Sequence, residues 1–170
     1  LNSTDAKRFP MTDRTRTYAW HDPEVLAAAT RDLGGLDLLQ RIASGELPQP
    51  GVGATVGFRL AEVEEGRAVF EGGWNDFMFN PAGTLHGGWY GIILDSCMGC
   101  AVHSTLPQGT GYTTLEYKVN ITRGITKDTG PVRAEGKVIH RGRRSATAEG
   151  KLTDASGKVY AHASTTCLIL

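Results

Sequence analysis

The sequence lacks the features that place a chain in a membrane or on a nucleic acid. Basic and acidic residues number 18 each, so the formal net charge is zero. Without an excess of either sign, bulk charge gives no reason to bind nucleic acid or an anionic membrane. No apolar run reaches the roughly 20 residues that span a bilayer. Residues 1–22 are polar and lack the apolar core of a signal peptide. We therefore expect a cytoplasmic protein with no membrane or nucleic-acid partner.

Cysteine and histidine are also scarce. The chain has three cysteines, an odd number that does not suit a disulfide framework and favours a reducing compartment. Cys97 and Cys100 form a C-x-x-C pair, but the pair lies inside an apolar stretch and has no second pair to complete a zinc site. This favours core packing over redox or metal chemistry. The five histidines show no ligand spacing, so we expect neither a metal nor a separate cofactor.

The first 50 residues predict an N-terminal extension. Residues 1–20 indicate a loosely ordered arm, and Asp22-Pro23 is typical of a helix start. Helices are predicted over 22–35 and 36–45, the second ending at a glycine. A linker over 48–51 then leads to the main body, which takes up residues 51–170.

The main body predicts an α+β fold. Alternating patterns and turn residues indicate six strands, over 54–66, 67–74, 112–123, 131–141, 143–154 and 158–169. Between the second and third strands lies one long apolar segment, predicted as a helix over 85–102. A single helix covers a sheet of this size only if the sheet curls. We therefore expect a curved antiparallel sheet of about six strands wrapped around a long central helix.

The central segment, "NPAGTLHGGWYGIILDSCMGC", contains residues that a buried helix usually avoids. Four glycines follow Leu85, and each costs roughly 1 kcal/mol in a helix relative to alanine. For Gly91 and Gly99, close packing against the sheet is the simple explanation. Gly87 and Gly88 fall in the first turn, where N–H groups have no partner in the helix and suit an anion or a polarised carbonyl. We expect Thr84 or Asn80 to cap this helix.

Asp95 lies between apolar neighbours in the same segment. It is either a buried carboxylate satisfied by backbone or serine hydroxyls, or a general base or nucleophile held away from water. Gly87 and Asp95 are eight residues apart, so a straight helix separates them by about 12 Å. If both act on one substrate, they must come from two chains whose helices run antiparallel. The spacing then predicts a dimer with sites at its interface.

The motif "NPAGTLHGG" followed by "LDS", with Asp95 nine residues after His86, resembles PaaI-type acyl-CoA thioesterases of the hotdog fold. The resemblance covers about residues 50–170. It implies a homodimer, often paired into a tetramer, that hydrolyses an acyl-CoA thioester. By this resemblance, Gly87 donates its N–H to the thioester carbonyl, and Asp95 of the facing subunit activates water or attacks directly. Asn80 would hold the water or the thioester, and His86 would orient the loop and Asn80.

The same resemblance implies a hydroxyl side chain near Asp95, from the strand that follows the helix. Thr113 and Thr114 are the candidates, and the spacing favours Thr114. Two further groups of residues have open interpretations. Arg141, Arg143 and Arg144 form a solvated turn or contact the phosphates of coenzyme A. The aromatic residues near the motif line an acyl pocket or pack in the core; they are Phe77, Phe79, Trp89 and Tyr90.

Two other functions remain as alternatives. A hotdog enoyl-CoA hydratase or dehydratase would pair the aspartate with a histidine, and His86 is the nearest candidate, although its spacing fits a thioesterase better. A non-catalytic acyl-CoA-binding regulator would carry a DNA-binding helix-turn-helix. The helices predicted over 22–45 contain few basic residues, which disfavours that role.

Overall fold

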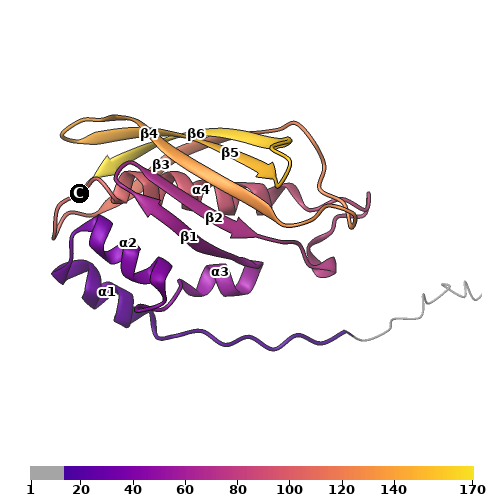
Figure 1. The fold of residues 1–170 in the computed structure, drawn as a ribbon, viewed down its shortest axis with the longest axis horizontal. Helices are drawn as coiled ribbons and strands as arrows, with labels where there is room; N and C mark the ends of the chain where they lie inside the picture. The colour runs from indigo at the N-terminus through magenta and orange to yellow at the C-terminus, as the bar shows by residue number, and fades with distance from the viewer. Residues whose placement is uncertain (1–13) are drawn as a thin grey trace, which may run out of the picture.

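A computed structural model describes residues 14–170 of the chain (Figure 1). The first 13 residues of the predicted arm lie outside the described residues. Residues 14–22 form neither helix nor strand and lead into α1 (Pro23–Asp32), where the Asp22 side chain accepts a hydrogen bond from the Glu24 amide. α2 (Gly35–Ser44) follows and ends at Gly45, whose φ of 85° is left-handed. Both predicted helices of the extension are confirmed.

A third helix, α3 (Gly51–Val56), corrects two predictions. Residues 48–51 were expected to be a linker and residue 54 to begin a strand. Instead Pro50 precedes the first turn of α3, and Gly57 ends the helix with a left-handed φ of 77°. The strand therefore begins only at Phe58, because Gly57 separates it from the helix.

The six predicted strands are confirmed and form one curved antiparallel sheet. They are β1 (Phe58–Glu64), β2 (Arg67–Gly72), β3 (Tyr112–Ile121), β4 (Val132–Arg141), β5 (Ser145–Asp154) and β6 (Val159–Ile169). The order across the sheet is β1-β2-β4-β5-β6-β3, so β3 occupies one edge although it precedes β4 in the chain. α2 packs against β1 at the other edge, so β3 is the edge that the described residues leave uncovered.

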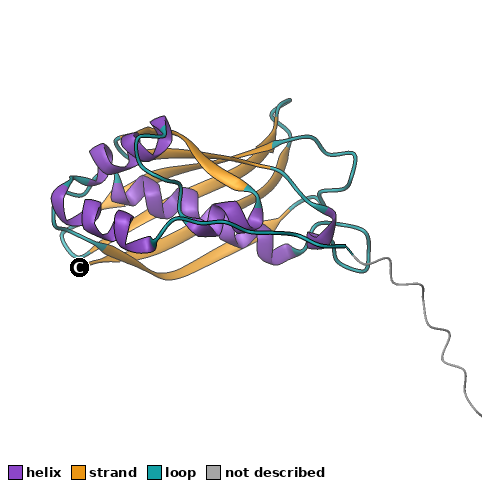
Figure 2. Ribbon diagram, turned by 90° about the horizontal axis from the view of Figure 1, so that it is seen from below, coloured by secondary structure: helices purple, strands orange, loops and turns teal. Residues whose placement is uncertain are grey.

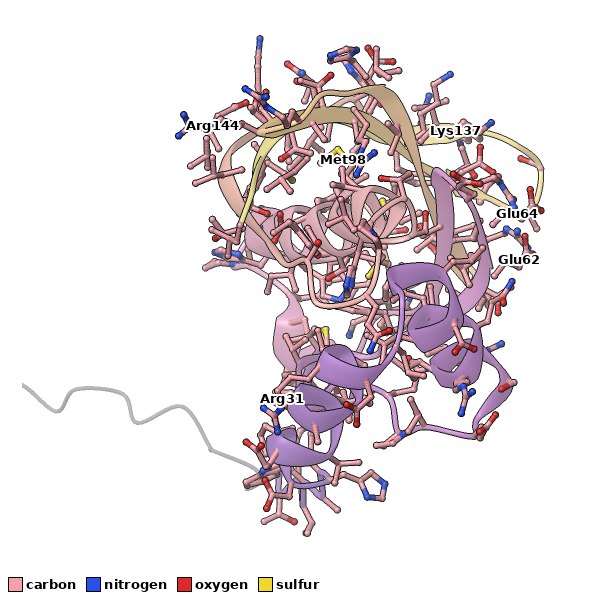
Figure 3. All side chains as sticks on the ribbon, turned by 90° about the vertical axis from the view of Figure 1, so that its left-hand side faces the viewer. Arg31, Glu62, Glu64, Met98, Lys137 and Arg144 are labelled. Carbon is pink, nitrogen blue, oxygen red and sulfur yellow. The ribbon has the colours of Figure 1, made fainter. Side chains whose placement is uncertain are left out.

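The long helix α4 (Gly87–His103) lies along the concave face of the sheet (Figure 2). The core fills the space between them, and Figure 3 shows Met98 there. Ile93, Leu94 and Leu152 are fully buried in the same cluster. β4 approaches the helix backbone at Gly136, where an added Cβ would lie 2.3 Å from the carbonyl oxygen of Cys97. The predicted wrapping of the sheet around one helix is confirmed.

One side of α4 is not covered by any other part of residues 14–170. Gly88, Ile92, Asp95 and Ser96 recur at helical spacing, and none of them is fully buried. We call these four residues the open stripe of α4. Ile92 keeps 37% of its surface exposed there although it lies in the most apolar helix. Among residues 14–170, no helix is both long and apolar enough to cross a membrane.

Candidate active site

The loop before α4 is organised by Asn80. Its side-chain oxygen accepts hydrogen bonds from the amides of Ala82 and Thr84, and its side-chain nitrogen donates to the Thr84 hydroxyl over 3.0 Å. Asn80 therefore closes the turn over residues 80–84. The expectation that Asn80 or Thr84 caps α4 is wrong, because both side chains are used within this turn.

His86 is the N-cap of α4. Its Nδ1 accepts a hydrogen bond from the Gly88 amide over 3.0 Å. An imidazole nitrogen that accepts carries no proton, so this contact fixes the ring in a form that is unprotonated at Nδ1. The expectation of a free N–H at Gly88 is therefore wrong. His86 orients the helix start, and no hydrogen bond joins it to Asn80 within the described chain.

At the start of α4, the backbone N–H of Gly87 differs from those of its neighbours, because each neighbouring N–H has a hydrogen-bond acceptor. The amides of Leu85, His86 and Trp89 donate to the carbonyl oxygens of Ile125, Met78 and His86, at 2.9 to 3.0 Å. The Gly88 amide donates to the His86 ring.

In residues 14–170, the Gly87 N–H has no hydrogen-bond partner, and Gly87 is exposed. An exposed N–H at the positive end of a helix suits a developing oxyanion.

Asp95 and Thr114 meet on the open stripe. The Thr114 hydroxyl donates to Oδ1 of Asp95 over 3.0 Å, and both side chains are partly buried. Thr113 is exposed and makes no hydrogen bond to the carboxylate. Ser96 instead donates to the carbonyl oxygen of Ile92. Within the described chain, Thr114 is the one hydrogen-bond donor to Asp95, so the carboxylate retains acceptor capacity for a water or a substrate.

The two middle glycines of α4 confirm the packing explanation. A Cβ at Gly91 would lie 3.2 Å from the Tyr117 hydroxyl, and one at Gly99 would lie 2.6 Å from the Tyr112 hydroxyl. Both tyrosines belong to β3, so this strand lies close against the helix beside Asp95. These contacts with β3 were not visible in the sequence, because they depend on which strand reaches the sheet edge.

A cavity of about 380 Å³ borders the start of α4. Its lining comes from α3, the loop before α4 and α4 itself, and consists of Val56, Phe77, Met78, Phe79, His86, Gly88, Trp89 and Ile92. Three of the four aromatic candidates therefore line a cavity. The fourth, Tyr90, is buried elsewhere, where its hydroxyl donates to the Arg123 carbonyl and accepts from the Ile125 amide. Val56 and Ile92 had not been recognised, because only the folded helices bring them together.

The three arginines of the β4–β5 turn are exposed. No side-chain hydrogen bond or ion pair engages Arg141, Arg143 or Arg144 within the described residues. Arg141 lines a hollow beside the start of α2. The Arg144 carbonyl accepts from the Ile169 amide near the β3 edge, and Figure 3 places this residue on the flank away from Glu62. The three guanidinium groups are therefore open to solvent and unpaired among the described residues.

The C-x-x-C pair packs in the core as expected. Cys97 is fully buried, and burial raises its pKa well above the ordinary thiol value. Burial, with a contribution from the nearby Asp95 carboxylate, raises the pKa of Cys100 to about 12. Both thiols are therefore protonated at neutral pH and poor nucleophiles. Across residues 14–170, no three His, Cys, Asp or Glu side chains gather where they could hold a metal ion.

Comparison with known proteins gives concordant matches. The family model of the thioesterase superfamily matches residues 82–161, which include α4, strands β3, β4 and β5, and the start of β6. A provisionally named esterase of Saccharolobus solfataricus is 32% identical over 105 residues, which are 62% of this chain and 73% of that protein. The 1,4-dihydroxy-2-naphthoyl-CoA hydrolase of Listeria monocytogenes is 27% identical over 109 residues, or 64% and 87% of the two chains.

Among solved structures, the phenylacetic acid degradation-related protein of Ralstonia eutropha JMP134 is similar to this chain, with a TM-score of 0.69 and 30% identity. The match covers 76% of this chain and 98% of that one.

Proposed function

The chain belongs to the thioesterase superfamily, and we propose that it is an acyl-CoA thioesterase that converts an acyl- or aryl-CoA to a carboxylate and free coenzyme A. The observation that supports this most directly is the Asp95–Thr114 hydrogen bond on an uncovered side of α4. It holds a carboxylate in place while leaving it accessible. The Listeria relative is, by its name, a hydrolase of a CoA thioester.

In the proposed reaction, the Gly87 N–H donates to the thioester carbonyl oxygen and stabilises the oxyanion that forms when the carbonyl carbon is attacked. Asp95 acts as general base on a water molecule, or attacks directly and forms an anhydride that water then hydrolyses. The carbon–sulfur bond breaks, and the coenzyme A thiolate takes up a proton. A thioester is activated enough for these two groups to suffice, so the reaction needs no metal or added cofactor. Asn80 and His86 act indirectly by holding the turn and the helix start.

We further propose that each site is shared between two subunits of a homodimer. Residues Gly87 and Asp95 of one α4 are too far apart, about 12 Å, to reach one carbonyl. Within residues 14–170, no other segment covers the open stripe of α4 or pairs with the outer edge of β3. Leu115, Tyr117 and Ile121 of β3 are 45 to 59% exposed, and a long apolar edge strand is prone to pair with another. Pairing of dimers into a tetramer is a further part of this proposal.

The arginines of the β4–β5 turn would bind the phosphates of coenzyme A. Arg143 and Arg144 are exposed, and Arg144 lies near the β3 edge, where the partner subunit would join. Guanidinium groups without a protein partner suit phosphate oxygens. The cavity beside Gly88 would hold the acyl group, because its lining is apolar and adjoins the helix start.

A panel of acyl- and aryl-CoA esters tests this function, with wild type and Asp95→Asn measured side by side. General base catalysis contributes about 10²- to 10⁴-fold, so Asp95→Asn is expected to lower kcat by that factor. Ser96→Ala on the same helix is the matched control, since its hydroxyl is used within the helix. Equal rates for wild type and Asp95→Asn would remove Asp95 from the mechanism. Hydrated product from an enoyl-CoA would favour the hydratase, and tight binding without turnover would favour a regulator.

A further inference from the structure

The described part of the N-terminal arm lies against two segments that form the wall of the acyl cavity. One is α3, which contributes Val56 to the lining. The other is the short 3-10 helix η1 (Asp76–Met78), which contributes Phe77 and Met78. Phe77 also lines a second hollow, on its arm side, together with Arg16 and Tyr18. Its ring therefore separates the acyl cavity from the arm.

Arg16 contacts both wall segments at once. Its guanidinium donates to the carbonyl oxygen of Ala54 in α3 over 3.0 Å. The same group lies 4.3 Å from the centre of the Phe77 ring and 4.4 Å from that of Tyr18. A guanidinium within about 6 Å of an aromatic ring is attracted to its face. One side chain thus links α3 to η1.

Neighbouring contacts keep the arm in this position. Arg14 forms an ion pair with Asp76, the first residue of η1. The Cβ of Trp20 would lie 3.2 Å from a side chain added at Gly51, so the arm also lies close to the start of α3. Phe77 itself is 53% exposed with the described part of the arm in place, so its ring is only partly packed, and Arg16 is one of the groups that hold it.

We propose that Arg16 is a positioning residue that sets the width of the acyl cavity by holding Phe77 against α3, and so determines which acyl groups the enzyme prefers. This inference rests on the proposed thioesterase function. Arg16 touches neither Asp95 nor Gly87, so its loss changes how the acyl group is held and not the chemistry of the ester bond. Loss of Arg16 lets the Phe77 ring move and weakens discrimination between acyl groups of different size.

The test measures kcat and KM on CoA esters of increasing acyl size, from acetyl to octanoyl and phenylacetyl, for wild type and Arg16→Ala. We expect KM for the preferred ester to rise about threefold to tenfold, the range given by losing a cation–π contact and a hydrogen bond, with kcat nearly unchanged. The ratio of kcat/KM between preferred and disfavoured esters is expected to fall by a similar factor. Arg16→Lys keeps a cation above the ring and is expected to restore part of the discrimination.

Arg59→Ala is the matched control, because Arg59 is an exposed arginine that pairs with Glu71 away from the cavity. A double variant of Arg16→Ala with Phe77→Leu links the effect to the ring, since coupled residues give less than the sum of their separate effects. Thermal unfolding of each variant reports whether the fold is kept, and the Lys variant serves if Arg16→Ala unfolds. If wild type is active, and Arg16→Ala and Arg16→Lys show the same relative kcat/KM values across the CoA esters as wild type, this inference is wrong and the proposed function stands. A wild type that hydrolyses no CoA ester would overturn the proposed function and this inference with it.

Discussion

Thr114 on β3 donates a hydrogen bond to Asp95 on α4 over 3.0 Å, and this contact joins the edge strand to the central helix at the open stripe. β3 reaches this position because it crosses to the far edge of the sheet, beside β6. The carboxylate is therefore held in one orientation by a strand that also presents an unpaired edge. The strand that orients the proposed catalytic carboxylate is thus the same strand that is proposed to join the partner subunit.

Loss of the Thr114 hydroxyl is expected to impair catalysis. A hydrogen bond to a carboxylate is worth about 1.5–3 kcal/mol, so Thr114→Val is expected to lower kcat roughly 10- to 100-fold with little change in KM. Thr114→Ser keeps the hydroxyl and is expected to retain most activity. Thr113→Val is the matched control, because Thr113 is exposed and does not reach Asp95. Steady-state kinetics decide, and a Thr114→Val enzyme as fast as wild type would contradict this role.

Removal of the turn arginines is expected to weaken binding of coenzyme A specifically. A combined Arg143→Ala and Arg144→Ala variant is expected to raise KM for an acyl-CoA roughly tenfold, because charge-assisted contacts to phosphate are lost. The same variant should hydrolyse the matching N-acetylcysteamine thioester, which has no phosphate, as well as wild type does. An equal loss on both substrates would show that the arginines act through the fold.

Close packing of the sheet on α4 predicts a marked difference between two glycines. Gly136→Ala places a methyl group 2.3 Å from the Cys97 carbonyl, so the free energy of unfolding is expected to fall by about 1–3 kcal/mol. At Gly130 an added Cβ meets no described atom within 4 Å beyond those of the two adjacent residues, so Gly130→Ala is expected to change the free energy of unfolding by less than about 0.5 kcal/mol. Denaturant unfolding of both variants is the measurement. Equal stability of the two variants would mean that β4 and α4 do not approach this closely.

The raised thiol pKa values predict slow alkylation in the native protein. Because Cys97 and Cys100 ionise well above neutral pH, iodoacetamide at neutral pH is expected to modify them only after unfolding. In the unfolded chain these thiols have a pKa of about 8.5. The free energy of unfolding is therefore unaffected by their ionisation below that pH, and it falls as pH rises further, because only the unfolded chain ionises them readily. Mass spectrometry of the alkylated protein checks this, together with thermal unfolding at neutral pH and at about pH 10. Rapid modification of native Cys100 at neutral pH would contradict it.

The main elements of the fold could be predicted from the sequence because their signals are local. Strand alternation, turn residues and one long apolar segment identified six strands and α4. The strand expected from residue 54 was wrong, because the left-handed backbone at Gly57 ends a helix there and short apolar stretches fit helix and strand alike. The residues on the uncovered side of α4 could not be predicted, since the apolar composition of the helix does not reveal which of its sides the sheet covers.

The site could be predicted only in part, because several of its contacts join segments that are distant in the sequence. Helical spacing separated Gly87 from Asp95, and the motif indicated both residues. The family resemblance singled out the Gly87 amide, but helix position alone left Gly87 and Gly88 equivalent, because the contact of the His86 ring with the Gly88 amide is visible only in the folded chain. The role of Arg16 depends on residues from the arm, α3 and η1 that are distant in sequence, and no local pattern joins them.

Mixing of defective subunits tests the shared site most directly. Gly87→Pro replaces the N–H by a ring carbon at the first helical position, where proline is tolerated, and His86 already has the extended ψ of 133° that precedes proline. The second variant is Asp95→Asn, and each alone is expected to be nearly inactive.

Co-expression with two different tags allows dimers that contain one subunit of each kind to be purified. If each site takes Gly87 from one subunit and Asp95 from the other, these dimers have one intact site and regain about half of wild-type acyl-CoA hydrolysis. Mixed dimers no more active than either parent would contradict the account.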